Sequence, residues 1–251
     1  MLHIATPFYR PQYLEAIYES IPKYHDITWH IAKTKNSPSL KYDFLKDPRI
    51  KVYEIDCSDK DTVTKRNTIF NHIKEGFFFL LDDDTIFVEE AYNVYKQYSE
   101  EGFVGMIVGN QLHGYDWLLG NKGRWPTTNP ATTFIDTGMV LCHFSVLNHV
   151  KWAWTAKDVE YGNDFYFWSR CLSYFGENST IMIDKYISIY NYFSPIIRVR
   201  KQLFFVKIKF DIYNVRLAKL YMNAFKVKEF LRKFFHIKRK IKEENKFPYR
   251  Q

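Results

Sequence analysis

Gly76-Phe77-Phe78-Phe79-Leu80-Leu81-Asp82-Asp83-Asp84-Thr85-Ile86-Phe87 joins an apolar run directly to three aspartates. Five apolar residues in a row, Phe77 to Leu81, are too few to cross a membrane, and they suit a strand that is buried on both faces. Open α/β sheets bind their ligands at the carboxyl ends of such strands, which is where the aspartates stand. The stretch therefore predicts an α/β fold with a site at this edge of the sheet.

The three adjacent carboxylates need either a bound cation or full exposure to water, because they repel one another. Side chains alternate along an extended chain, so we expect Asp82 and Asp84 to share one side while Asp83 points away. Hard oxygen ligands on one side suit Mg²⁺ or Mn²⁺, which commonly bridge to substrate phosphates. The pattern predicts a divalent-metal site, and a solvated acidic turn is the alternative.

Hydrophobic periodicity divides the chain before residue 196 into alternating strands and helices. The expected strands cover residues 2–6, 28–32, 51–55, 77–81, 103–108 and 133–141, with one or two more in 181–192. The expected helices cover residues 12–21, 61–74 and 88–100, and another opens at Asn163. Residues 110–131 contain glycines, prolines and tryptophans and are expected to form a long loop over a site. This order of elements predicts a parallel sheet flanked by helices.

Three further segments carry candidate site residues. Lys65-Arg66-Asn67 lies on an expected helix and either faces the phosphates or base of a ligand or forms a solvated face. Gly138 lies within a strand pattern, where it marks either a close approach of backbone to a ligand or a bulge. Asn163 is a candidate N-cap, which places Asp164 in the first helical turn. There Asp164 either stabilises the helix dipole or acts as a general base beside a metal.

Charge is divided unevenly along the chain. The 251 residues have a net charge of +8, but residues 196–251 hold 17 basic and 4 acidic residues, against 19 basic and 24 acidic residues before them. No apolar run approaches ~20 residues, so no transmembrane helix is expected. The amino terminus lacks the charged and apolar regions of a signal peptide, and the 3 cysteines fit neither a disulfide framework nor a zinc pattern. We therefore expect a reducing, cytoplasmic location.

The basic tail, residues 196–251, repeats apolar residues at intervals of three and four, which predicts one long helix or two stacked ones. It could form a coiled coil that joins copies of the chain, cover the main domain, or lie on an anionic membrane. Only the last use explains both the apolar stripe and the positive charge. We therefore expect residues 196–242 to bind the membrane, with a homo-oligomer through the tail as an alternative.

Four pieces of the sequence, taken in order, resemble the GT-A glycosyltransferases that use nucleotide-sugar donors, in particular their family 2. The pieces are Ile4-Ala5-Thr6-Pro7-Phe8-Tyr9-Arg10, Lys65-Arg66-Asn67, the Asp82-Asp83-Asp84 strand end and Asn163-Asp164. The resemblance covers residues 1–195 and leaves residues 196–251 as a basic amphipathic helical extension. It implies the GT-A fold, a Rossmann-like α/β architecture with a mixed, mainly parallel sheet flanked by helices.

The resemblance also implies roles for individual residues. The nucleotide sugar would be bound by Thr6, Pro7, Tyr9, Arg10, Arg66, Asn67, Asp82 and Asp83. Asp84 would be the main metal ligand with Asp82 beside it, and Asp164 would deprotonate the acceptor hydroxyl, as in inverting members. The acceptor and sugar side would include Gly138, Trp152, Trp154 and Asn163. Two features depart from the family: Asn163-Asp164 replaces the commoner Glu-Asp pair, and no histidine occupies the late metal-binding position, so the third protein ligand and the anomeric outcome stay open.

The expected protein is a glycosyltransferase with Mn²⁺ or Mg²⁺ as cofactor. Its donor would be a nucleoside diphosphate sugar, of which a UDP-sugar is the first choice, and its acceptor a saccharide or lipid-linked saccharide. Its setting would be the assembly of cell-surface polysaccharide or lipopolysaccharide at the inner face of the membrane. A nucleic-acid-binding protein that uses the basic tail is one alternative, although the acidic body argues against it. A nucleotidyltransferase is another, although the first strand is followed by no glycine-rich phosphate loop.

Overall fold

The structure is a computed structural model, and it describes residues 1–37, 40, 42–113, 135–153 and 163–190. The expected helical tail lies outside these residues, as do most of the expected long loop and Trp154. Within the described residues no helix has the length and apolar character needed to span a membrane.

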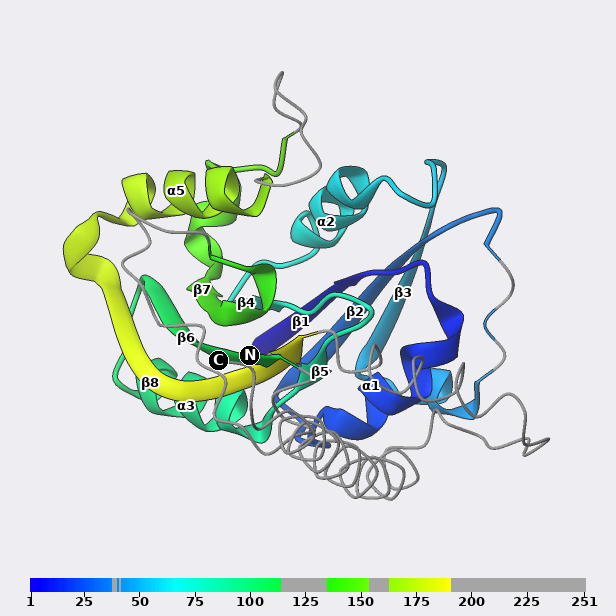
Figure 1. Ribbon diagram of the computed structural model, residues 1–251, viewed down its shortest axis with the longest axis horizontal. Coiled ribbons are helices and arrows are strands. Elements are labelled where there is room, and N and C mark those ends of the chain that lie inside the picture. The colour runs from blue at the N-terminus through cyan, green and yellow to red at the C-terminus, as the bar shows by residue number, and fades with distance from the viewer. Residues whose placement is uncertain (38–39, 41, 114–134, 154–162, 191–251) are drawn as a thin grey trace, which may run out of the picture.

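One sheet of eight strands forms the centre of the described part of the chain (Figure 1). The strands are β1 (Leu2–Pro7), β2 (Ile27–Thr34), β3 (Ile50–Ile55), β4 (Phe77–Leu80), β5 (Ile86–Phe87), β6 (Met106–His113), β7 (Val140–His143) and β8 (Thr180–Tyr190). They lie in the order β3-β2-β1-β4-β7-β6-β8-β5. Strands β3, β2, β1 and β4 are parallel to one another, as are β6 and β8, whereas β7 is antiparallel to β4 and β6, and β5 is antiparallel to β8. The sheet is thus mixed and begins with a parallel half, as expected.

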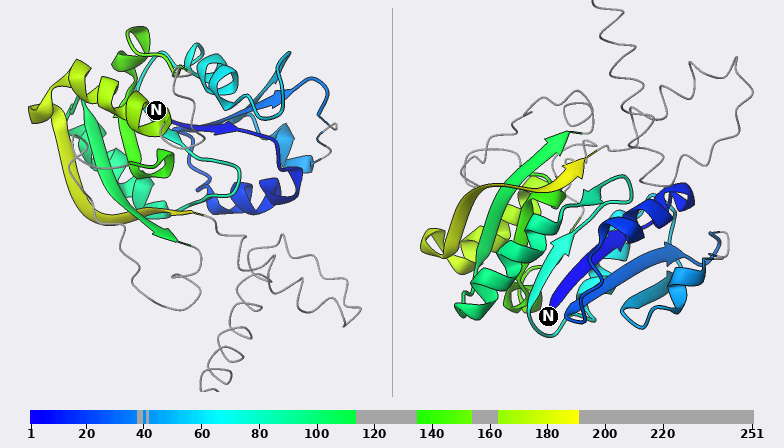
Figure 2. Two further views of the ribbon diagram at one scale, coloured as in Figure 1. Left: turned by 45° about the horizontal axis from the view of Figure 1, so that its top comes forward. Right: turned by 90° about the horizontal axis from the view of Figure 1, so that it is seen from below.

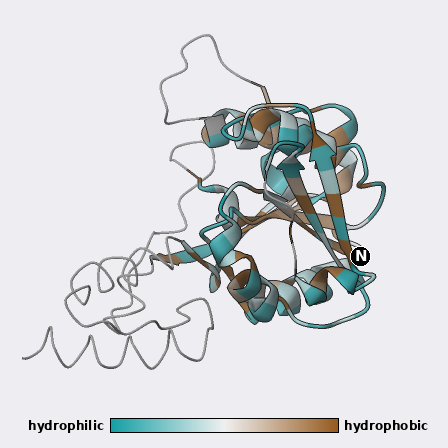
Figure 3. Cartoon of the chain, turned by 90° about the vertical axis from the view of Figure 1, so that its right-hand side faces the viewer, coloured by the Kyte–Doolittle hydropathy of each residue, from teal (hydrophilic) through white to brown (hydrophobic). Residues whose placement is uncertain are grey.

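Helices cover both faces of the sheet (Figures 1 and 2). The helices α1 (Leu14–Ser20) and α3 (Glu89–Glu100) pack on one face, and α2 (Thr62–Phe70) and α5 (Asn163–Phe175) pack on the other. Asp61 caps α2, because its side chain accepts a hydrogen bond of 2.9 Å from the Thr64 amide. The helices carry both hydrophilic and hydrophobic residues, as expected for helices with one face on a sheet (Figure 3).

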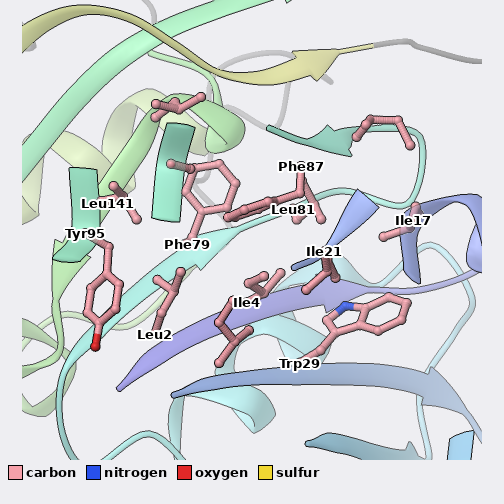
Figure 4. Packing of buried hydrophobic residues seen from close by; sticks show 14 of the residues in the cluster. Leu2, Ile4, Ile17, Ile21, Trp29, Phe79, Leu81, Phe87, Tyr95 and Leu141 are labelled. Atoms are coloured by element: carbon pink, nitrogen blue, oxygen red, sulfur yellow. The ribbon is translucent and has the colours of Figure 1, made fainter. Parts of the chain in front are cut away.

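Strand β4 divides its side chains between two cores. Phe77 and Phe79 enter the cluster that α1 and α3 cover, where Phe79 lies near Leu141 and Phe87 (Figure 4). Phe78 and Leu80 enter the cluster that α2 and α5 cover. All four side chains are at most 2% exposed. The prediction of a strand buried on both faces is confirmed, and successive residues serve opposite cores because side chains alternate along a strand.

Several expected boundaries were wrong. The strand β7 begins at Val140 and not at residue 133, and α2 ends at Phe70 and not at residue 74. Cross-strand pairing explains a third error. Strand β6 continues to His113 instead of ending at residue 108, because its later residues pair with β8. Two of its polar side chains donate hydrogen bonds across that pair: the Asn110 side-chain amide donates to Asp184 at 2.7 Å and the Gln111 side-chain amide donates to Ser188 at 3.0 Å. Residues 110–113 were therefore expected in a loop, but their pairing with β8 makes them part of a strand. The short strand β5 was missed, and β8 is one continuous strand.

Candidate active site at the carboxyl edge of the parallel strands

The site lies where the carboxyl ends of β1 and β4 meet. These strands are adjacent and parallel, so the loop after β1 and the three aspartates after β4 emerge at the same edge. Because β4 ends at Leu80, the aspartates belong to a turn and do not alternate. The expectation that Asp83 points away from Asp84 was therefore wrong, because Arg10 binds both Asp83 and Asp84, whereas Arg66 binds Asp82.

Arg10 binds two of the three aspartates. Its Nη1 lies 2.5 Å from Asp84 Oδ2, and its Nε lies 3.3 Å from Asp83 Oδ1. The backbone amides of Tyr9 and Arg10 both donate to Asp83 Oδ2, at 2.8 and 2.7 Å. Asp83 is 1% exposed and is thus compensated on both oxygens, as a buried carboxylate must be. The Arg10 guanidinium also lies 4.4 Å from the centre of the Tyr9 ring.

Arg66 joins the aspartate turn to the start of α5. Its Nη2 donates to Asp82 Oδ1 at 2.9 Å, and its Nη1 lies 3.5 Å from Asp164 Oδ1. The guanidinium lies 4.2 Å from the centre of the Trp152 ring. Arg66 itself is 5% exposed, and its Nε has no hydrogen-bond partner within the described part of the chain. A single buried cation thus holds Asp82 and the expected base Asp164 together, although 98 residues separate Arg66 from Asp164.

Asp136 and Thr137 complete this cluster and were not predicted. The 3₁₀ turn η3 (Thr137–Met139) places the Thr137 hydroxyl 3.1 Å from Asp82 Oδ2 and 3.0 Å from Asp136 Oδ1. The Thr137 amide donates to Asp136 at 2.6 Å. Three carboxylates, those of Asp82, Asp136 and Asp164, therefore surround Arg66 and Thr137. No sequence motif marked these two residues, because Thr137 lies 55 positions from Asp82 and meets it only in the fold.

Withdrawal from water raises the pKa of most carboxyl groups in the site. Burial raises the pKa of Asp83 to about 6 even though Arg10 works to lower it, and it raises the pKa of Asp84 in the same way. Burial, with the neighbouring Asp164 and Asp82, raises the pKa of Asp136 to about 7. Burial raises the pKa of Asp164 to about 6 against the opposing effect of Arg66. The cluster thus holds more negative charge than its two arginines neutralise, which favours a further cation or a hydrogen-bond-donating ligand.

The remaining candidate residues have these positions. Thr6 is fully buried, and its hydroxyl accepts a hydrogen bond of 2.9 Å from the Trp29 indole. Pro7 ends β1, and Tyr9 is 43% exposed.

The side-chain amide of Asn67 exchanges two hydrogen bonds with the Trp152 backbone, of 2.8 and 2.9 Å. Trp152 is 2% exposed and packs against Phe167. These contacts engage Thr6, Asn67 and Trp152 with protein groups, so their assignment to ligands stays a prediction.

The helix α5 begins at Asn163, as expected, with Asp164 in its first turn. Gly138 lies in the turn η3 and not in a strand, which corrects the expected pattern. A Cβ atom there would lie 2.5 Å from the Gln111 amide nitrogen and 2.8 Å from the Ser188 hydroxyl. The close approach at Gly138 is therefore to side chains of β6 and β8.

The carboxylates fit one kind of metal site. Within the described residues, no group of three or more histidine, cysteine, aspartate or glutamate side chains is placed to enclose an ion. Mg²⁺ usually needs fewer protein ligands, because one or two carboxylates hold it together with substrate phosphates. Asp84 and Asp82 supply such oxygens, and Asp84 Oδ1 accepts a hydrogen bond of 3.4 Å from the Thr85 hydroxyl. The donor set fits a metal shared with a substrate and does not fit a closed protein cage.

Comparison with known proteins identifies the fold. No model of a known family and no curated protein matches the sequence. Among solved structures, TarS 1–349 from S. aureus is similar with a TM-score of 0.58 and 11% sequence identity, over 87% of this chain and 69% of that one. The same protein in complex with UDP-GlcNAc gives a TM-score of 0.56 and 12% identity, over 75% and 57% of the two chains. A longer TarS chain gives 0.59 and 11%, over 90% of this chain and 42% of its own length. The chain therefore has the GT-A fold that its sequence resembles.

Proposed function

We propose that this protein is a metal-dependent glycosyltransferase that moves a sugar from a nucleoside diphosphate donor to a hydroxyl group of a saccharide acceptor. One observation carries the proposal: the aspartate turn after β4, Arg10 after β1 and Asp164 at the start of α5 meet at one edge of the sheet. An acidic turn alone would equally suit a solvated loop. Its connection through Arg66 to a carboxyl group with a pKa of about 6 supports a reaction site.

The residues support a displacement at the anomeric carbon. The acceptor hydroxyl attacks this carbon, the bond from the carbon to the diphosphate oxygen breaks, and the nucleoside diphosphate leaves. Asp164 takes the hydroxyl proton; a base with a pKa near neutral pH is largely ionised and still basic enough for this step. Arg66 holds Asp164 in place through their contact of 3.5 Å. A divalent cation held by Asp84 and Asp82 would neutralise charge on the departing diphosphate.

The donor class is proposed from the same arrangement. Arg10 contacts two aspartates of the turn. Burial works to lower the pKa of Arg10, but Asp83 and Asp84 raise this pKa, so the charge of Arg10 is permanent. A permanent guanidinium and a shared metal together suit a pyrophosphate. TarS has been solved with UDP and UDP-GlcNAc, which makes UDP-sugars the first donors to test.

The test is the release of nucleoside diphosphate from a panel of nucleotide sugars in the presence of Mn²⁺, with a mixture of acceptor saccharides. Asp84→Asn should abolish release and also abolish the thermal stabilisation that Mn²⁺ with UDP gives the wild type. Asp43→Asn is the matched control, because the Asp43 side chain is 98% exposed and far along the chain from the site. Full turnover by Asp84→Asn in excess chelator would refute the metal-dependent mechanism.

We further propose that the tail brings this site to a membrane. The support is its sequence, in which 17 basic and 4 acidic residues combine with an apolar repeat. The acceptor would then be a lipid-linked saccharide of a surface polysaccharide. Flotation with vesicles of anionic and of neutral lipid tests this, and equal recovery with both would contradict it.

A further inference from the structure

Lys65 is a fully buried lysine next to Arg66 on α2, and nothing in the reaction proposed above uses it. Its Nζ donates to two carbonyl oxygens, that of Phe8 at 2.9 Å and that of Asp59 at 2.5 Å. The first belongs to the loop after β1 and the second to the loop between β3 and α2. Burying an ammonium group is costly, and backbone carbonyls compensate it less well than a carboxylate does. A methionine would fill the same space without this cost, so the charge itself requires an explanation.

The contact with Phe8 fixes one particular peptide unit. The Phe8 carbonyl and the Tyr9 amide belong to the same planar trans peptide, so they point in opposite directions. Lys65 binds the carbonyl side, and the carboxylate of Asp83 accepts from the amide side at 2.8 Å. A cation and an anion therefore hold the two ends of one peptide dipole. The next amide, that of Arg10, donates to the same Asp83 oxygen at 2.7 Å.

The contact with Asp59 extends this arrangement to a second and a third strand. The Asp59 side chain accepts from the hydroxyls of Thr34 at 2.5 Å and of Ser37 at 3.1 Å, which lie at and after the end of β2. The Phe8 amide in turn donates to Ala32 of β2 at 2.8 Å. Lys65 therefore ties together the segments that follow β1, β2 and β3, all at the edge of the sheet where the site lies.

We propose that Lys65 is a positioning residue for the nucleotide: it orients the Phe8–Tyr9 peptide, and through it Asp83 and Arg10, for the diphosphate of the donor. This inference rests on the proposed function for its ligand, whereas the orientation of the peptide does not depend on it. Without the ammonium group the carbonyls of Phe8 and Asp59 lose their donors, and the loop that carries Arg10 can turn away from Asp83 and Asp84. Donor binding should then weaken while the sheet beneath stays folded.

The experiment compares wild type with Lys65→Met, Lys65→Arg and the control Lys60→Met, which removes an exposed lysine from the neighbouring loop. Amide hydrogen exchange reports the loop directly, because the amides of Tyr9 and Arg10 are the ones that Asp83 binds. In Lys65→Met we expect these two amides to exchange more than tenfold faster, while those of Trp29 and Ile31 in β2 keep their wild-type rates. The affinity for UDP, titrated with Mn²⁺ present, should fall about tenfold in parallel. Lys65→Arg should restore part of the slow exchange and part of the UDP affinity. Lys60→Met should have the wild-type exchange rates and the wild-type affinity.

Wild-type exchange at Tyr9 and Arg10 in Lys65→Met would overturn the proposal, as would a uniform acceleration through β1 and β2, which indicates a general loss of stability. If Lys65→Met does not fold, the uncharged variant Lys65→Gln decides: faster exchange confined to the two loop amides supports the inference, and wild-type rates refute it. Failure of wild type to bind UDP would count against the proposed donor, whereas the exchange rates still test what Lys65 does to the loop.

Discussion

Replacing Arg66 with methionine tests whether this buried cation holds the site together. Methionine retains an unbranched side chain that can pack against Trp152, so the change mainly removes the guanidinium. Three interactions disappear with it: the ion pairs with Asp82 at 2.9 Å and with Asp164 at 3.5 Å, and the cation–π contact of the guanidinium with the Trp152 ring at 4.2 Å. The carboxylates of Asp82, Asp164 and Asp136 then lie close together without a nearby positive charge.

The magnitude follows from the burial of the partners. Breaking a fully buried ion pair by removing one partner costs about 3–5 kcal/mol. Here the side chain of Arg66 is 6% exposed, but those of Asp82 and Asp164 are 27% and 33% exposed, so water screens part of the loss. We therefore expect the free energy of unfolding to fall by about 1–3 kcal/mol at pH 8.

The loss should depend on pH in a defined direction. The pKa of Asp164 is raised to about 6 and that of Asp136 to about 7, so the folded protein keeps protons that the unfolded chain releases. Groups of this kind stabilise the fold at low pH, and that stability is lost as the pH rises from about 4 through the folded-state pKa values. Removing Arg66 raises these pKa values further. The destabilisation by Arg66→Met should therefore be larger at pH 8 than at pH 5.

Urea unfolding followed by circular dichroism, at both pH values, measures this difference. Lys46→Met is the control, because it breaks an ion pair of 3.0 Å whose two side chains are 83% and 98% exposed, and it should change stability by less than about 0.5 kcal/mol. Equal stability of wild type and Arg66→Met at pH 8, or a larger loss at pH 5 than at pH 8, would refute the reasoning.

Three further predictions concern the reaction, the core and the tail. Asp164→Asn should lower turnover more than about 100-fold while UDP affinity stays within a factor of about two, because only the base is lost; an equal loss of affinity in calorimetry would argue for a binding role instead. Phe79→Ala should lower the free energy of unfolding by about 3–5 kcal/mol in denaturant titrations, whereas Val52→Ala, at a side chain that is 39% exposed, should change it by less than about 1 kcal/mol. Reversing the charges of Lys238, Arg239 and Lys240 to glutamate should reduce recovery with anionic vesicles at low salt, and unchanged recovery would separate the tail from membrane binding.

The choice of partners within the site could not be predicted from local patterns. Extended-chain alternation placed Asp82 and Asp84 together, but the strand had already ended at Leu80, so the turn geometry decided which arginine each carboxylate meets. The sequence left open whether Lys65-Arg66-Asn67 faces the phosphates or base of a ligand or forms a solvated face. In the structure Lys65 binds the loop after β1 and Arg66 binds the carboxylate cluster. Asn67 binds the Trp152 backbone.

Local sequence by itself determined the buried strand, the order of strands and helices, and the place of the acidic turn. These follow from side-chain period and from apolar content, which act over a few neighbouring residues. Only the tertiary structure decided that Asp136 and Thr137 join Asp82, that Arg66 bridges Asp82 and Asp164, and that Lys65 binds the loop after β1. Such contacts join segments far apart in the chain, and their energies depend on burial and on charges that no local pattern contains.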